Sequence, residues 1–319
     1  MLKPIPVPQR DPPLPPQETL PTMYDLPSDN PEDSGLPDEF HLLQPALLTN
    51  TFNTPHYTPN EIFCGADMNL YYDVQHPLWY KRPDWFLVVG VPRLYAEKDL
   101  RNSYVIWQEG EHPYVIVELL SPGTAPEDLG DYASNDPAIL ELDDNSNNPE
   151  KSSASETILE GNGSLSSRKK TLSKWEVYEQ KLRVPYYVVF SRYSNKLWFF
   201  KLEGGKYQKQ RISAEKPRLW IPELEAGLGL WQGEYQGINR LWLRWYDSQD
   251  RWIPTEAEDA IATAQQERIL KKDAIVRAQQ AELQLQRVTL NLLQSGMAIE
   301  QVATITGLSV EKVQEIMEG

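Results

Sequence analysis

The chain of 319 residues contains a single cysteine, Cys64. An intrachain disulfide and a cysteine-based zinc site are therefore excluded, and this scarcity is typical of a reducing compartment. The first twenty residues lack the apolar centre of a secretory signal, and no uninterrupted apolar run is long enough to span a bilayer. We therefore expect a soluble, cytoplasmic protein with no membrane partner.

The sequence also lacks an excess of basic residues, since its net charge is −15. Taken alone, this charge argues against a nucleic-acid partner. However, residues 1–60 carry −6 and residues 127–160 carry −9, so these two segments account for the whole imbalance. The rest of the chain is near neutral, which permits a nucleic-acid partner without giving electrostatic support for one.

Changes of composition divide the chain into segments. Residues 1–45 are rich in proline and acids, which predicts a disordered tail, and residues 46–60 resemble a boundary strand or loop. We expect order to begin near Ile62, inside a folded domain that spans 46–250. Asparagine, serine, aspartate and glycine dominate 129–171, which predicts a disordered insertion within that domain.

Short runs of β-branched and aromatic residues alternate with turn residues inside the predicted domain, which indicates strands. The expected strands cover 85–89, 104–108, 114–120, 184–191, 196–202, 206–212, 219–222, 227–231 and 238–246. Between the third and fourth, Trp175, Tyr178 and Leu182 fall at helical spacing and predict a helix over 172–182. The pattern predicts an α/β fold with a mixed sheet flanked by helices.

The amino-acid composition changes at Pro254. Acidic residues occupy the first turn of a long helix predicted over 254–295. Aliphatic residues recur in it every seven positions, at Ile269, Val276, Leu283 and Leu290. The other core positions of this repeat are polar, namely Lys272, Gln279 and Gln286. The repeat therefore predicts a weak coiled-coil seam rather than a stable long coiled coil.

Residues 296–319 predict two short helices around Gly307, similar to a helix-turn-helix. The helix that would enter a DNA groove, 310–317, carries Glu311 and Glu315 against only Lys312, with Glu318 next to it. Acids facing phosphates repel them. We therefore expect a packing or homo-oligomerisation module, although DNA binding by this segment stays an alternative.

Two carboxylates carry the candidate chemistry. Asp84 follows Pro83 at the start of one predicted strand, and Glu118 lies near the end of an otherwise apolar neighbouring strand. A carboxylate in such a run is costly unless something compensates its charge. A divalent cation is a natural compensator, and it could also activate water.

The order of segments RPDWFLVVG, YVIWQEG, YVIVELLSPGT, DLG and KWEVYEQKLRVPYYVVF resembles the Uma family (Uma-two type) of restriction-endonuclease-like proteins, in the PD-(D/E)xK nuclease superfamily. The likeness covers residues 61–207 apart from the insertion. It implies an endonuclease that hydrolyses DNA phosphodiester bonds with Mg²⁺ or Mn²⁺. Asp84, Glu118 and the carbonyl of Leu119 would hold the metal ion.

One position departs from the superfamily pattern, because Leu120 stands where the lysine of E-x-K belongs. The resemblance implies that the lysine has moved to the following helix, where Lys174 fits, and that it stabilises charge at the phosphate. Tyr178 lies one turn later on the same helix face. Asp128 would orient Lys174, and Asp67 is a further upstream acid.

Each of these residues also has a structural explanation. Asp84 could cap a turn after Pro83, Glu118 could form a buried ion pair without metal, and Lys174 could be a solvated helix residue. Ser121 lacks a nucleophile elbow and indicates a turn. The histidines form no metal-ligand pattern; they are His41, His56, His76 and His112. The alternative function is a catalytically degenerate nuclease fold that acts as a binding or regulatory module.

Overall fold

The computed structural model describes residues 38–121, 124–135 and 172–318. Within it the chain forms two units, Met1–Ile253 and Pro254–Gly319. The first is built on a six-stranded mixed sheet with the order β1-β4-β6-β7-β8-β9. Its strands are β1 (Ile62–Gly65), β4 (Trp85–Val89), β6 (Val115–Leu119), β7 (Tyr186–Ser191), β8 (Lys196–Glu203) and β9 (Lys206–Lys209).

The middle of the sheet is buried on both faces. Every residue of β4, β6 and β7 is buried, which explains why these strands are near-continuous apolar runs. β6 and β7 are parallel, with Glu118 opposite Val189, whereas β4 is antiparallel to β6. Glu118 therefore lies in the centre of the sheet, at the carboxyl end of a strand that has neighbours on both sides.

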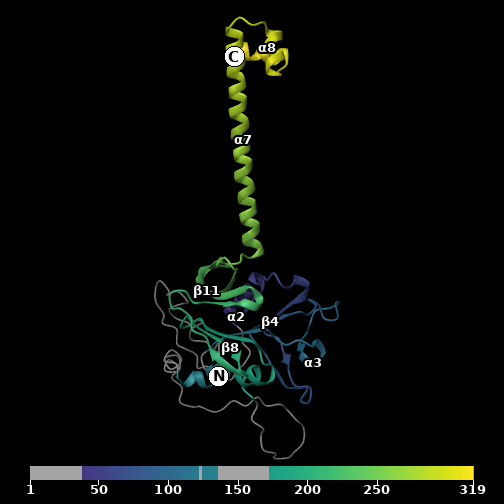
Figure 1. The fold of residues 1–319 in the computed structure, drawn as a ribbon, viewed down its shortest axis with the longest axis vertical. Helices are drawn as coiled ribbons and strands as arrows, with labels where there is room; N and C mark the ends of the chain where they lie inside the picture. Colours follow the sequence, from purple (N-terminus) through teal and green to yellow (C-terminus); the bar gives the residue numbers. More distant parts are fainter. Residues whose placement is uncertain (1–37, 122–123, 136–171, 319) are drawn as a thin grey trace, which may run out of the picture. The chain divides into compact units, whose positions relative to one another are not determined.

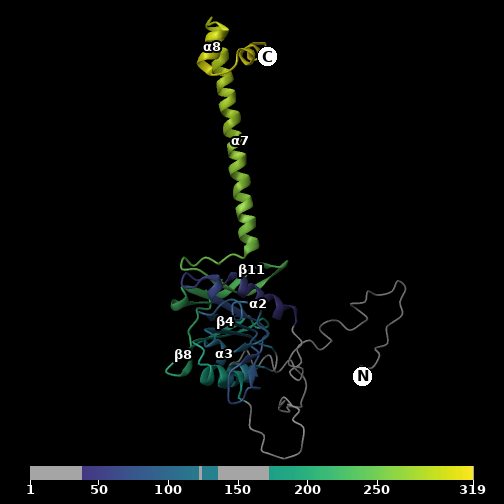
Figure 2. The ribbon, with the colours of Figure 1, turned by 90° about the vertical axis from the view of Figure 1, so that its right-hand side faces the viewer.

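Helical segments cover one face of the sheet and a helix with a second sheet covers the other. The first face packs against α4 (Ala125–Leu129), the 3-10 helix η2 (Gly130–Asn135), α6 (Lys174–Glu176) and the π-helix η3 (Val177–Lys181). The second packs against α2 (Glu39–Thr51) and the sheet of β10 (Arg218–Ile221), β11 (Ala226–Tyr235) and β12 (Ile238–Tyr246). In both ribbon views α2 and β11 lie on the same side of β4 (Figures 1 and 2).

A small third sheet continues into the central one. It joins β3 (Tyr80–Lys81), β2 (Leu70–Tyr71) and β5 (Tyr104–Val105), and β5 runs directly into the short helix α3 (Ile106–Glu109). A 3-10 turn, η1 (Pro59–Glu61), precedes β1, and another, η4 (Pro222–Leu224), follows β10. Because β3 ends at Lys81, only two residues separate it from Asp84, so the chain passes from this sheet to the ends of the interior strands where the candidate residues lie.

The fold class predicted from the sequence is confirmed, and three local predictions are wrong. Residues 39–51 form α2 instead of a tail and boundary loop, because Gln44 exchanges hydrogen bonds with the backbone of Leu243 on β12 and the helix buries Phe40 and Leu48. The strand expected over 104–108 ends at Val105, and residues 106–109 are helical.

The third wrong prediction is the start of the insertion at residue 129. Residues 129–135 are helical because Leu129 and Ala133 are buried in the main core. The remaining insertion, 136–171, and the tail up to residue 37 lie outside the described residues. Within the described residues, burial of a few hydrophobic side chains therefore makes these polar segments helical despite their composition.

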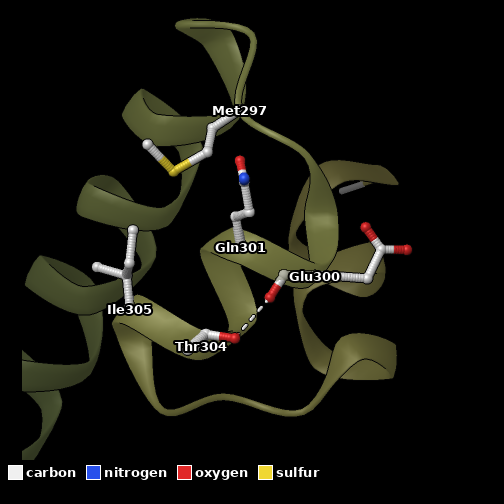
Figure 3. Close-up of a pocket in the computed structure, with 5 residues that line it drawn as sticks. All are labelled: Met297, Glu300, Gln301, Thr304 and Ile305. Carbon is white, nitrogen blue, oxygen red and sulfur yellow. Dashed lines mark hydrogen bonds between the residues drawn. The ribbon is translucent and has the colours of Figure 1, made fainter.

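The second unit matches its prediction closely. It consists of α7 (Glu256–Gln294), α8 (Ile299–Thr306) and α9 (Val310–Glu318), and Val302, Ala303 and Val313 form its small core. Met297, Glu300, Gln301, Thr304 and Ile305 line an open, shallow pocket, where the Thr304 hydroxyl donates back to the Glu300 carbonyl (Figure 3). Within the described ranges, no helix is long and apolar enough to cross a membrane.

Candidate active site

Glu118 is the centre of a buried polar cluster. Its side chain has no exposed surface, and three donors reach its carboxylate. The Lys174 ammonium lies 2.9 Å from Oε2, the Tyr178 hydroxyl donates to Oε1 at 2.7 Å, and the backbone N–H of Asp84 donates to Oε2 at 3.3 Å. The structure thus satisfies a carboxylate that would otherwise be strongly destabilising in an apolar strand.

Local sequence explains how Lys174 and Tyr178 reach Glu118. Ser173 caps the helix in a capping box with Glu176, and the Glu127 carboxylate accepts the backbone N–H of Lys174 at 3.0 Å. Helix α6 therefore starts at Lys174, and a side chain four residues later lies on the same face. The position at which this helix begins therefore places both Lys174 and Tyr178 next to the Glu118 carboxylate.

Asp84 joins the cluster from the start of β4, an interior strand. Its Oδ2 accepts the backbone N–H of Leu119 at 2.6 Å, just beyond the last pairing of β4 with β6. The Asp84 side chain thereby continues the hydrogen bonding of the two strands and holds its own carboxylate next to that of Glu118. The sequence suggested a turn cap as the structural alternative for Asp84, but in the structure its carboxylate accepts a hydrogen bond from β6 instead.

Asp128 lies on the other side of Lys174. Its Oδ1 is 3.6 Å from the Lys174 ammonium, and that oxygen is buried with no hydrogen-bond partner among the described residues. Lys174 is therefore bracketed by two buried carboxylates, Glu118 and Asp128. The Tyr187 hydroxyl donates to the Asp128 carbonyl at 2.7 Å, which fixes this residue against β7.

Burial dominates the electrostatics of the cluster. It raises the pKa of Glu118 to about 8, with Asp84 adding to the rise and Lys174 opposing it. Burial likewise raises the pKa of Asp128 to about 6. The neighbouring carboxylates overcome burial at Lys174 and hold its pKa well above the usual value. The lysine therefore stays charged, while one further cation would favour ionisation of both acids.

Comparison with known families gives one match. Residues 16–138 match the family model Uma2, described as "Putative restriction endonuclease". This stretch is Uma2-like. The resemblance identified from the sequence is thereby confirmed for the stretch that carries Asp84, Glu118 and Asp128, and it is consistent with the PD-(D/E)xK superfamily.

The Uma2 match ends before Lys174 and Tyr178, so the part of the site on α6 and η3 rests on the structure alone. No curated protein and no solved structure matches the chain. The geometry of the cluster therefore carries more of the functional argument than the comparisons do.

Asp67 lies apart from the cluster around Glu118. It forms an ion pair with Arg82 at 2.9 Å, and 54% of its side chain is exposed. Its backbone N–H reaches the carbonyls of Pro83 and Asp84, so the residue supports the turn before β4. Ser121 likewise takes part in a turn, in which Thr124 bonds its backbone.

His41 is a residue that sequence reasoning missed. Its Nδ1 lies 2.8 Å from Oδ1 of Asp38, and its Nε2 lies 3.3 Å from the carbonyl oxygen of Leu119, the atom expected to be a metal ligand. The only sequence signal is an aspartate three residues before a histidine at a helix start. Nothing in that signal shows that α2 brings His41 to the end of β6.

The cluster offers oxygen donors but no complete set of metal ligands. Among the residues described, no three or more histidine, cysteine, aspartate or glutamate side chains converge on one point. Asp84, Glu118 and the Leu119 carbonyl are hard oxygen donors of the kind that Mg²⁺ prefers, and Mg²⁺ usually keeps several waters. The donor chemistry therefore fits a partly hydrated divalent cation.

Proposed function

We propose that the first unit is a divalent-metal-dependent endonuclease that hydrolyses DNA phosphodiester bonds. The observation that carries this proposal is the Glu118 carboxylate, fully buried and bonded to Lys174, with the Asp84 carboxylate beside it at the end of the same two strands. The description of the Uma2 family supports the same chemistry.

In this proposal, Asp84, Glu118 and the Leu119 carbonyl hold Mg²⁺ or Mn²⁺. The bound cation supplies a water of lowered pKa and neutralises charge at a phosphoryl oxygen. Asp128 already has the Lys174 ammonium as its cation at 3.6 Å, so the proposed ligand set does not include it.

Lys174 stabilises negative charge in the proposed reaction. Lys174 is 22% exposed and its charge interacts with that of the half-buried Asp84, so it could meet a phosphate that approaches this part of the cluster. There it would stabilise the negative charge that develops during attack on phosphorus. Tyr178 acts as a positioning residue, since it holds Oε1 of Glu118 and leaves the opposite oxygen to Lys174.

Two measurements on purified full-length protein test the proposal. Wild type should cleave plasmid DNA only when Mg²⁺ or Mn²⁺ is present, and titration calorimetry should detect Mn²⁺ binding. Asp84→Asn and Glu118→Gln should abolish both, and Lys174→Gln should abolish cleavage while retaining Mn²⁺ binding. If wild type neither cleaves nor binds Mn²⁺, the proposal is wrong.

Glu179 provides a matched control. It is also a buried carboxylate paired with a lysine, because Lys206 lies 2.8 Å from its Oε2, yet it faces β9 and not the Glu118 cluster. Glu179→Gln removes one buried carboxylate charge, as Glu118→Gln does, but from η3, the segment that also carries Tyr178. It should leave cleavage and Mn²⁺ binding intact.

A second candidate function is a degenerate nuclease fold that serves as a binding or regulatory module. The observation in its favour is that both oxygens of Glu118 already have protein donors, as in a purely structural ion pair. This function predicts that wild type binds DNA or another partner without cleaving it under any metal condition. It also predicts that Glu118→Gln leaves that binding unchanged.

A further inference from the structure

Helix α7 exposes a row of aliphatic side chains along its middle part. Ile269, Val276 and Leu283 are 55, 42 and 64% exposed, and they lie seven residues apart on one face. Further along the helix, Leu292 and Leu293 pack against the core of α8 and α9. The row thus remains uncovered up to the point where this small helical module begins.

The charged residues beside this row are placed as in a parallel, in-register coiled coil, where opposite charges face each other across the two helices. In such a pair, the residue before each core position faces the residue five positions later on the partner helix. Arg268 precedes Ile269 and would face Asp273, and Glu282 precedes Leu283 and would face Arg287. Both contacts join opposite charges, and twofold symmetry forms each of them twice.

We propose that α7 pairs with α7 of a second copy of this chain as a short, parallel, in-register coiled coil. The occupant is a second copy because the pattern of Arg268, Asp273, Glu282 and Arg287 complements itself. Ile269, Val276 and Leu283 form the apolar layers of the interface. The coiled coil ends soon after Leu283, because α7 is partly covered from Leu285 onward and Thr289 is buried.

Polar residues in the core of the proposed coiled coil limit the affinity of the dimer. Lys272 and Gln279 occupy the alternate core positions, where they weaken association and favour one register over others. We therefore expect a reversible dimer that dissociates on dilution into the micromolar range. A parallel pair attaches both nuclease-like domains to the same end of the coiled coil, since each α7 begins directly after Pro254 and Thr255.

Neighbouring residues provide the matched test. Ile269 and Leu270 are almost equally exposed, at 55 and 54%, but only Ile269 lies in the seven-residue row. By sedimentation analysis, the full chain should show a dimer of twice 36.7 kDa. Ile269→Asp should convert it to a monomer, and Leu270→Asp should leave the dimer intact. A wild-type monomer at tens of micromolar, or equal effects of both variants, would overturn the proposal.

Charge reversal and cross-linking test the direction of the pair. Glu282→Arg should weaken association on the order of tenfold, and adding Arg287→Glu should restore it, because positions five apart do not meet within one helix. In Val276→Cys, mild oxidation should link the two copies, while the native Cys64 belongs to the other unit. Failure of both the rescue and the cross-link in a dimeric protein would overturn the parallel arrangement. DNA cleavage is not measured in any of these experiments, so their failure is distinct from failure of the proposed function.

Discussion

Asp84 and Glu118 hold each other in place across β4 and β6. The backbone N–H of Asp84 donates to the Glu118 carboxylate at 3.3 Å, and the Asp84 carboxylate accepts the N–H of the residue after Glu118 at 2.6 Å. Two carboxyl groups are thus kept close by backbone donors rather than by mutual attraction. Such an arrangement is costly without a cation and well suited to binding one.

Substitutions of Asp84 should separate its structural role from its charge. Asp84→Ala leaves the Leu119 N–H without its acceptor and should lower the free energy of unfolding by about 1–3 kcal/mol. Asp84→Asn keeps an acceptor oxygen and should cost less, yet it should remove Mn²⁺ binding as fully as alanine does. Urea unfolding and calorimetry of the two variants check this; equal stability losses would contradict the bond to Leu119.

Lys174→Met should destabilise the protein in a manner that depends on Glu118. Removal of the ammonium leaves a buried carboxylate without compensation, which costs about 3–5 kcal/mol in comparable pairs. Adding Glu118→Gln removes the stranded charge and should recover part of the loss. A double-mutant cycle by chemical unfolding measures the coupling, and strictly additive effects would show that the 2.9 Å contact contributes nothing.

The sequence predicted the parts of the site that local pattern determines. The all-apolar strands around Trp85 and Val117 predicted a central sheet, and one glutamate among apolar residues predicted a buried polar site at Glu118. Helical spacing placed Tyr178 one turn after Lys174. These signals depend on residue type and period, which a single sequence contains.

The sequence did not predict the parts that depend on contacts distant in the chain. Helix α2 contains Pro45 and follows an acidic, proline-rich stretch, and it is held in place by bonds from Gln44 to β12, 199 residues away. The approach of His41 to the Leu119 carbonyl follows from the same docking. Tertiary packing overrides local composition at both places, so only a three-dimensional structure could reveal them.

The stability of the metal-free protein should fall as the pH rises from mildly acidic to mildly alkaline. In the folded state the pKa of Glu118 rises from 4.5 to about 8 and that of Asp128 from 3.8 to about 6. Between these limits the folded protein keeps protons that the unfolded chain has released. The free energy of unfolding therefore decreases with pH, by at most about 1.4 kcal/mol per pH unit for each group.

Two variants should remove separate parts of this pH dependence. Glu118→Gln should flatten the curve between about pH 4.5 and 8, and Asp128→Asn should flatten only the part between about pH 4 and 6. Urea unfolding at several pH values in the presence of a chelator measures both. A wild-type curve that rises through this range would contradict the pKa shifts that burial produces.

Tyr178→Phe should reveal how far one hydroxyl group controls Glu118. The change keeps the ring that packs in the core but removes the 2.7 Å bond to Oε1, which should cost about 1–2 kcal/mol of stability. That bond lowers the pKa of Glu118. Its loss should therefore raise the upper limit of the pH range over which Glu118 makes the stability depend on pH, here called the Glu118 window.

Tyr187→Phe is the matched control for Tyr178→Phe. Its hydroxyl is also buried and also donates at 2.7 Å, but to the backbone carbonyl of Asp128. The two variants should lose similar stability, while only Tyr178→Phe should shift the Glu118 window and lower the rate of metal-dependent cleavage. Equal effects of both on the pH profile would show that Tyr178 acts through packing, and the role of its hydroxyl in positioning Glu118 would then be wrong.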